Sequence, residues 1–253
     1  MSIKKSTSWV VCFRLFGIPV SIHPVSWVVL ALLGGALGVD DGAGLYKVAV
    51  FVAVGMLTLL VHEFGHALTG RAAGALVSGI EIAGMGGATH FAMLPPGRFA
   101  YSMVVAAGPL ASLLLGGVLG VCFGWQLGSV WSGVQYAYLM PWMDVLPMSL
   151  QHELVMGLTR NECSLMMIDV YTTGMLVCFW WSIFNLLPIL PLDGGKLLAV
   201  VLKNYLIPSV LGVLICCGLA VWALVAGSWF NVMILGYLAF INWQYLCAVR
   251  SRR

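Results

Sequence analysis

Five consecutive residues, His62-Glu63-Phe64-Gly65-His66, combine two imidazoles and a carboxylate at a spacing that suits a metal ion. On a helix, residues four apart project from the same face, so both histidines can reach one ion while Glu63 stays beside it. Such a ligand set leaves the fourth position of a tetrahedral Zn²⁺ open to water. The ion lowers the pKa of that water, and Glu63 can take its proton and pass it to a leaving amine. The motif therefore predicts zinc-dependent hydrolysis.

This motif lies in a chain whose composition is that of an integral membrane protein. Of its 253 residues, 61% are hydrophobic and 8% are charged, and the mean hydropathy is +1.01. Soluble domains carry roughly a quarter charged residues, so a soluble enzyme and a disordered or fibrous protein are excluded. The net charge of +3 is too small and too scattered to indicate a nucleic-acid partner. Placing three titratable groups in a membrane helix is costly, which favours a functional motif over a polar packing cluster.

The elements that must position the motif are six apolar stretches, each close to the roughly 20 residues that a membrane-spanning helix needs. They cover residues 18–39, 48–68, 99–123, 170–190, 206–225 and 229–249. With the amino terminus in the cytoplasm, ten Lys and Arg residues fall on the inner side and two, Lys47 and Arg160, on the outer side. This asymmetry predicts that both termini are cytoplasmic. The sequence thus predicts an all-α, multi-pass membrane protein with six transmembrane helices and a single domain over residues 1–253.

A Gly-rich segment after the second stretch, Leu76–Phe91, is too polar to span a membrane and too apolar for an ordinary loop. Its glycines allow bulges and turns, so the segment predicts a short re-entrant β-hairpin. Irregular backbone survives at membrane depth only where protein buries it or where it lines a wet cavity.

The predicted metal site needs a third protein ligand, and the depth of each acid in the membrane selects among the candidates. His62 lies fourteen residues into the second stretch, or about 21 Å at about 1.5 Å per residue. The fourth stretch also runs inward, and Asp193 follows its inner end at nearly the same depth. Carboxylates on interrupted helices commonly build intramembrane ion sites. Asp193 is therefore the predicted third ligand; capping a helix or pairing with Lys196 are its alternative roles.

These residues resemble the site-2 protease family of intramembrane zinc metalloproteases. The resemblance rests on HEFGH, on the run NLLPILPLDGG that begins at Asn185, and on AGPLA at Ala107. It extends to GIPVSIHP at Gly17, as in compact prokaryotic members without PDZ or CBS modules. The commonest family motif has proline where this chain has Leu190, which leaves every ligand in place.

The resemblance implies a metalloprotease core over about 48–196 in a prokaryotic inner membrane. It implies one Zn²⁺ held by His62, His66 and Asp193, with Glu63 as catalytic base. It also implies that Asn185 holds the substrate strand or the tetrahedral intermediate; tying down backbone freed by Pro188 is the alternative.

The resemblance further implies that the substrate is a single-span membrane protein or a signal-peptide remnant in the lipid bilayer, cut near the cytoplasmic side in regulated proteolysis. A peptide bond in a helix is protected by its own hydrogen bonds, so the substrate must unwind locally. We expect an extended substrate strand to pair with Ile80, Glu81 and Ile82 by edge addition. A divalent-metal transporter using the same His and Asp cluster is the alternative function.

Overall fold

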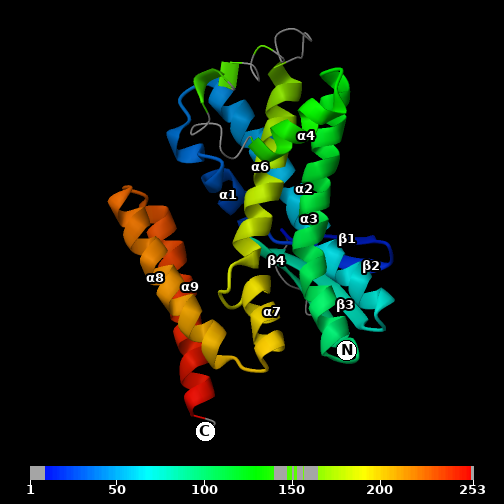
Figure 1. The fold of residues 1–253 in the computed structure, drawn as a ribbon, viewed down its shortest axis with the longest axis vertical. Helices are drawn as coiled ribbons and strands as arrows, with labels where there is room; N and C mark the ends of the chain where they lie inside the picture. Colours follow the sequence, from blue (N-terminus) through cyan, green and yellow to red (C-terminus); the bar gives the residue numbers. More distant parts are fainter. Residues whose placement is uncertain (1–8, 140–146, 150, 153–155, 157–164, 252–253) are drawn as a thin grey trace.

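The computed structural model describes residues 9–139, 147–149, 151–152, 156 and 165–251, and shows a bundle of long helices with a small sheet beside it (Figure 1). The fold is mostly helical, as the sequence predicts, but its four strands are more than the single predicted hairpin. In chain order the elements are β1 (Val11–Leu15), β2 (Ile18–Ile22), α1 (Pro24–Leu33), η1 (Ala36–Gly38), α2 (Gly42–Ala72), β3 (Leu76–Ala83), β4 (Gly86–Met93), α3 (Arg98–Gln126), α4 (Val130–Leu139), α6 (Leu165–Leu186), α7 (Asp193–Leu202), α8 (Leu206–Val225) and α9 (Trp229–Arg250).

The first predicted span, residues 18–39, is wrong, because this stretch is divided between a strand and a short helix. Ile18, Val20 and Ile22 are buried at every second position of β2, the periodicity of a strand with one covered face. Pro24 then begins α1, which has only 10 residues. Ten residues rise about 15 Å, half of the roughly 30 Å hydrocarbon core. The described part of the chain therefore has five helices, not six, that are long and apolar enough to cross a membrane.

The other five predicted spans are confirmed as α2, α3, α6, α8 and α9. In Figure 1, α2, α3 and α6 run side by side, whereas α8 and α9 pair with each other at one edge of the molecule. The crossing of α2 and α3 depends on small residues, since a Cβ on Gly65 would press against the Ala107 carbonyl and the Ala111 methyl. Such close approach is how membrane helices gain packing energy. It brings α3 directly against the part of α2 that carries the histidines.

The predicted hairpin is present as β3 and β4, and it belongs to a larger sheet. The four strands follow the order β1-β2-β3-β4, with β2 and β3 parallel and the other pairs antiparallel. Ile80 and Ile82 of β3 are 2% and 0% exposed and pack with Leu59 and Phe64 of α2. One face of the sheet thus covers the α2 segment that contains the His-Glu motif. The depth of the hairpin in the membrane stays a prediction.

A short irregular segment between α6 and α7 is held in place by α9. The amide oxygen of Asn242 accepts from the Leu190 N–H at 3.0 Å, and its NH₂ group donates to the Leu190 carbonyl at 2.6 Å. Asn242 is fully buried, and Gly212 of α8 gives it room. This side chain satisfies backbone groups that Pro188 and Pro191 exclude from a helix. It thereby fixes the chain three residues before Asp193.

We expect Asn242→Ala to destabilise the protein by about 1–3 kcal/mol, because it leaves the Leu190 N–H and C=O buried without their partner. Thermal unfolding in detergent measures the effect. Asn231→Ala is the matched control, since Asn231 is an exposed residue of the same helix. Equal midpoints for the two variants would contradict the role of Asn242.

Candidate metal centre

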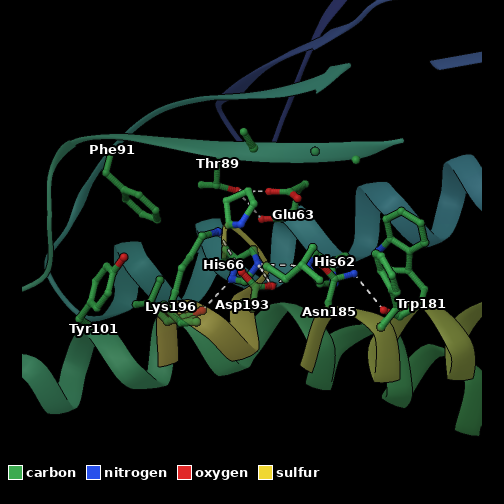
Figure 2. A pocket seen from close by; sticks show the side chains of 18 of the residues that line it. His62, Glu63, His66, Thr89, Phe91, Tyr101, Trp181, Asn185, Asp193 and Lys196 are labelled. Carbon is green, nitrogen blue, oxygen red and sulfur yellow. Dashed lines mark hydrogen bonds and ion pairs between the residues drawn. The ribbon is translucent and has the colours of Figure 1, made fainter. Parts of the chain in front are cut away.

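Three ligand atoms from two helices meet at one point. The Nε2 atoms of His62 and His66 lie 3.2 Å apart, as expected for residues one turn apart on α2. Oδ2 of Asp193, the first residue of α7, lies 3.0 Å from the His62 nitrogen and 3.1 Å from the His66 nitrogen. All three side chains are buried, and Figure 2 shows them pointing toward one another. The structure therefore brings together the three residues that the sequence selected as ligands.

The triangle formed by these atoms has the dimensions of a zinc site. Ligands about 2.0 Å from a tetrahedral ion lie about 3.3 Å from one another, close to the three observed separations. Buried imidazole nitrogens and a carboxylate oxygen are also the donor types that Zn²⁺ takes in catalytic sites. Glu63 is a fourth candidate, because a ligand atom of its carboxylate lies within 4.8 Å of both imidazoles. Its carboxylate, however, has another partner, whereas one oxygen of Asp193 faces both rings.

The outer nitrogens of both imidazoles are tied to α3. Nδ1 of His66 donates to the Val104 carbonyl at 2.8 Å. Nδ1 of His62 lies 3.2 Å from the hydroxyl of Ser112, which itself donates to the Gly108 carbonyl and so accepts from the ring. With both Nδ1–H groups engaged outward, the Nε2 lone pairs point to the site, as metal ligation requires. Gly108 is essential to this approach, since a Cβ there would overlap the His66 ring.

Glu63 is oriented by the hairpin and not by α3. The hydroxyl of Thr89, on β4, lies 2.8 Å from Oε2 of Glu63 and 3.0 Å from its backbone carbonyl. The backbone at Gly87 also approaches so closely that a Cβ would overlap the Glu63 side chain. β4 thus holds the carboxylate beside the cluster of His62, His66 and Asp193 (Figure 2).

Asp193 also has a second partner, Lys196, one turn further along α7. Nζ of Lys196 lies 3.1 Å from Oδ1 of Asp193, which leaves Oδ2 to the imidazoles. Burial lowers the pKa of Lys196, but the Asp193 carboxylate outweighs it and the net pKa is raised. Pairing with Lys196, the alternative role left open by the sequence, is therefore compatible with ligation. The close fit of α7 depends on Gly194 and Gly195, where side chains would collide with backbone at the end of α6.

The cluster lines a pocket of about 370 Å³ between α2, α3, α6, α7 and β4. Asn185 belongs to the same pocket, and its NH₂ group donates to the carbonyl of Trp181 at 2.9 Å. This bond is internal to α6 and leaves the amide oxygen beside the site (Figure 2). Asn185 and Trp181 thus both line the pocket that contains the predicted ligands, and the role of Asn185 toward the substrate stays a prediction.

The residues predicted to pair with substrate lie in the wrong strand for edge addition. Ile80, Glu81 and Ile82 are bonded to β2 on one side and to β4 on the other. The Glu81 carboxylate also contacts His23 at 2.9 Å and His90 at 3.2 Å, on the sheet face away from α2. The sheet order leaves β4 as the outer strand next to the pocket, which Gly86–Thr89 line. Which strand of the hairpin keeps a free edge cannot be read from its own sequence, because this depends on the pairing of β3 with the distant strand β2.

Sequence reasoning missed two residues that orient the site, Ser112 behind His62 and Thr89 beside Glu63. Ser112 had one readable signal, since a polar residue in an apolar span usually faces the bundle interior. Thr89 had none, because its contact with Glu63 depends on how the hairpin folds back over α2.

A membrane bundle that converges two histidines, an aspartate and a separately held glutamate on one pocket defines an intramembrane metallopeptidase. The chain belongs to Peptidase family M50, the site-2 protease family, which residues 49–212 match. Members of this family are membrane metalloproteases that use zinc.

A solved structure supports the fold along nearly the whole chain. The Site-2 Protease from Methanocaldococcus jannaschii matches with a TM-score of 0.58 and 19% sequence identity, over 94% of this chain and 95% of that one. At this identity the likeness concerns the fold alone. No curated protein matches the sequence.

Ser112→Ala should weaken zinc binding about 10- to 100-fold, because the His62 ring loses the acceptor that orients it. Competition with a chromogenic chelator measures the affinity. Ser182→Ala is the control, since Ser182 is equally buried but bonds only to the Cys178 and Pro109 carbonyls. Equal zinc affinity in the two variants would show that Ser112 does not orient His62.

Thr89→Val should lower kcat for peptide cleavage about ten-fold or more, because Glu63 loses a hydrogen bond to its charged group. Thr89→Ser retains the hydroxyl and should keep most of the activity. Zinc content and KM are measured in parallel and should stay unchanged in both variants. Equal kcat values for Val and Ser would show that the hydroxyl does not position Glu63.

Proposed function

We propose that the protein is an intramembrane zinc endopeptidase in which His62, His66 and Asp193 hold one Zn²⁺ and Glu63 is the catalytic base. The observation that carries this proposal is the triangle of Nε2, Nε2 and Oδ2 atoms, with sides of 3.0–3.2 Å, beside an acid that is not part of it. When bound, the ion polarises the scissile carbonyl and acidifies a water molecule.

The chain's own residues supply the remaining chemistry. Glu63 takes a proton from the attacking water and returns it to the leaving amine. Thr89 keeps the carboxylate in place during both transfers. The amide oxygen of Asn185 faces the pocket and can accept from a substrate backbone N–H, which would hold an unwound segment beside Glu63.

The substrate strand is best accommodated by β4, whose outer edge borders the pocket. Extended peptides add to exposed sheet edges through main-chain hydrogen bonds. This choice replaces Ile80–Ile82, since both neighbours of β3 are already present. Edge addition also places the scissile bond next to Thr89 and Glu63.

The form of the substrate follows from an apolar groove that opens on the metal pocket. The groove measures about 590 Å³ and lies between α1, α2 and α6 on one side and α8 and α9 on the other. Met85, Trp181 and Phe184 line both the groove and the metal pocket. Its lining is almost wholly aliphatic and aromatic, which suits a transmembrane segment such as a single-span protein or a signal-peptide remnant. We place this activity in regulated proteolysis at a prokaryotic cytoplasmic membrane.

The proposed orientation has the metal site near the cytoplasmic side. Arg71 lies in the last turn of α2, Arg98 begins α3 and Arg250 ends α9, and these helix ends all lie in the lower half of Figure 1. Lys47 lies in the first turns of α2, at the opposite end. Basic residues favour the cytoplasmic face, so the lower end and the carboxyl terminus are assigned there. The amino-terminal residues 1–8 lie outside the described part of the chain, so their cytoplasmic location stays a prediction.

Glu63→Gln should retain zinc and lose at least about a hundred-fold in cleavage rate, because general-base catalysis contributes about 10²–10⁴-fold. Purified enzyme, a panel of single-span peptides and metal analysis provide the readouts. His66→Ala and Asp193→Ala should lose both zinc and activity. Full cleavage by Glu63→Gln would exclude the mechanism, and metal flux into sealed vesicles without cleavage would favour the transporter alternative.

A further inference from the structure

The metal pocket continues in two directions of opposite character. Toward α8 and α9 it opens on the apolar groove, which no charged residue lines. Toward the junction of α3 and α7 it meets a second cavity of about 510 Å³, and Leu94 and Tyr101 line both. This second cavity is lined by the side chains of Arg98 and Lys203. We call it the basic pocket.

The cations of the basic pocket have no acidic partner within the described ranges. The ion pairs found there involve Lys196, His23, His62, His66 and His90, and none involves Arg98 or Lys203. Both side chains are exposed.

The acids of the adjoining metal pocket have other partners, since Asp193 contacts Lys196 and both histidines and Glu63 contacts Thr89. Asp40 and Asp41 precede α2 and Asp169 lies near the start of α6, at the opposite end of these helices. Lys203 has a left-handed backbone with φ +54°, a conformation that usually costs a non-glycine residue free energy. The basic pocket is therefore an uncompensated positive site that borders the catalytic pocket.

We infer that the basic pocket binds acidic side chains of the substrate on the side of the scissile bond that leaves the membrane. This inference rests on the proposed endopeptidase function. The substrate class is then a segment that is apolar on one side of the cut, where it lies in the groove, and anionic on the other. Charge complementarity and the shared lining residues Leu94 and Tyr101 support the substrate as occupant.

The helix geometry sets the position of these acids. Lys203 directly follows the last residue of α7 and comes ten residues after Asp193, or about 15 Å along the helix axis. Arg98 precedes Val104, the partner of His66, by six residues on α3, or about 9 Å. An extended chain advances about 3.3 Å per residue, so the acids belong about three to five residues from the scissile bond.

Such a preference discriminates among membrane proteins, because cytoplasmic flanks of transmembrane segments are usually rich in Lys and Arg. A basic pocket repels that common flank and accepts the rarer acidic one. Selection by repulsion as well as attraction is a general route to specificity.

The test is a charge exchange between enzyme and substrate. Full-length enzyme in neutral phosphatidylcholine vesicles is assayed on three peptides that differ only at positions three to five beyond the cut, which carry Asp, Gln or Lys. The wild type should cleave the Asp peptide with a kcat/KM about five- to ten-fold above that of the Lys peptide, as expected for two partly exposed ion pairs. The preference should shrink between about 0.05 M and about 0.5 M salt.

The double variant Arg98→Glu/Lys203→Glu should reverse this order, with the Lys peptide cleaved faster than by the wild type. A gain on one peptide cannot arise from misfolding. Arg250→Glu is the matched control, since Arg250 is an exposed cation at the same end of the molecule and lines none of the three cavities described. It should leave the wild-type order intact.

Three results would overturn the inference. One is equal cleavage of the Asp and Lys peptides by the wild type, and another is an unchanged order in the double variant. The third is a rate that ignores peptide charge but rises with phosphatidylglycerol in the vesicles and loses this dependence in the double variant, which would assign the pocket to a lipid phosphate. If the wild type cleaves none of the peptides and Glu63→Gln behaves identically, the endopeptidase function itself fails.

Discussion

The convergence of two imidazoles and one carboxylate from separate helices is the constraint on which the rest of the structure depends. Ligand atoms 3.0–3.2 Å apart in a buried, largely apolar bundle are tolerable only when they neutralise one another or share an ion. Small residues meet this constraint: Gly65 and Gly108 let α3 approach α2, and Gly194 and Gly195 let α7 approach the end of α6. The same contacts place Ser112 and the Val104 carbonyl behind the rings, so packing and ligand orientation have one cause.

The four-stranded sheet covers one side of the site and orients Glu63. Its covered face seals the histidine segment of α2, while β4 reaches over the site and holds Glu63 through Thr89. The proposed base and the proposed metal ligands are thus positioned by different elements. α3 orients the histidines and α7 carries Asp193, whereas β4 holds Glu63. Because β4 is also the outer strand beside the pocket, the proposed substrate edge and Thr89, which holds the proposed base, lie on one strand. The proposed substrate docking and the alignment of Glu63 therefore both depend on β4.

The pocket has different surroundings on its two sides, and this difference carries the proposed selectivity. Aliphatic and aromatic side chains from α1, α2, α6, α8 and α9 form one approach, and Arg98 and Lys203 mark the other. The chain has only 12 Lys and Arg residues, so two unpaired cations beside the catalytic pocket are a substantial share of its charge. Asn242 of α9 stabilises this arrangement, because it bonds to Leu190 in the segment that connects α6 to α7.

The sequence by itself determined the membrane class, five of the spans, the hairpin and the metal-binding motif, because these depend on local spacing and on summed hydrophobicity. It also selected Asp193, since depth along a helix can be counted. Only the tertiary structure decided that residues 18–39 form a strand and a short helix. A short apolar run with β-branched residues can form either a helix or a strand, and here β1 and β3 supply the hydrogen-bond partners that a strand needs. The same holds for the free edge of β4, the Thr89–Glu63 bond and the Asn242 clamp on Leu190. All three depend on residues that are distant in sequence, so no local pattern encodes them.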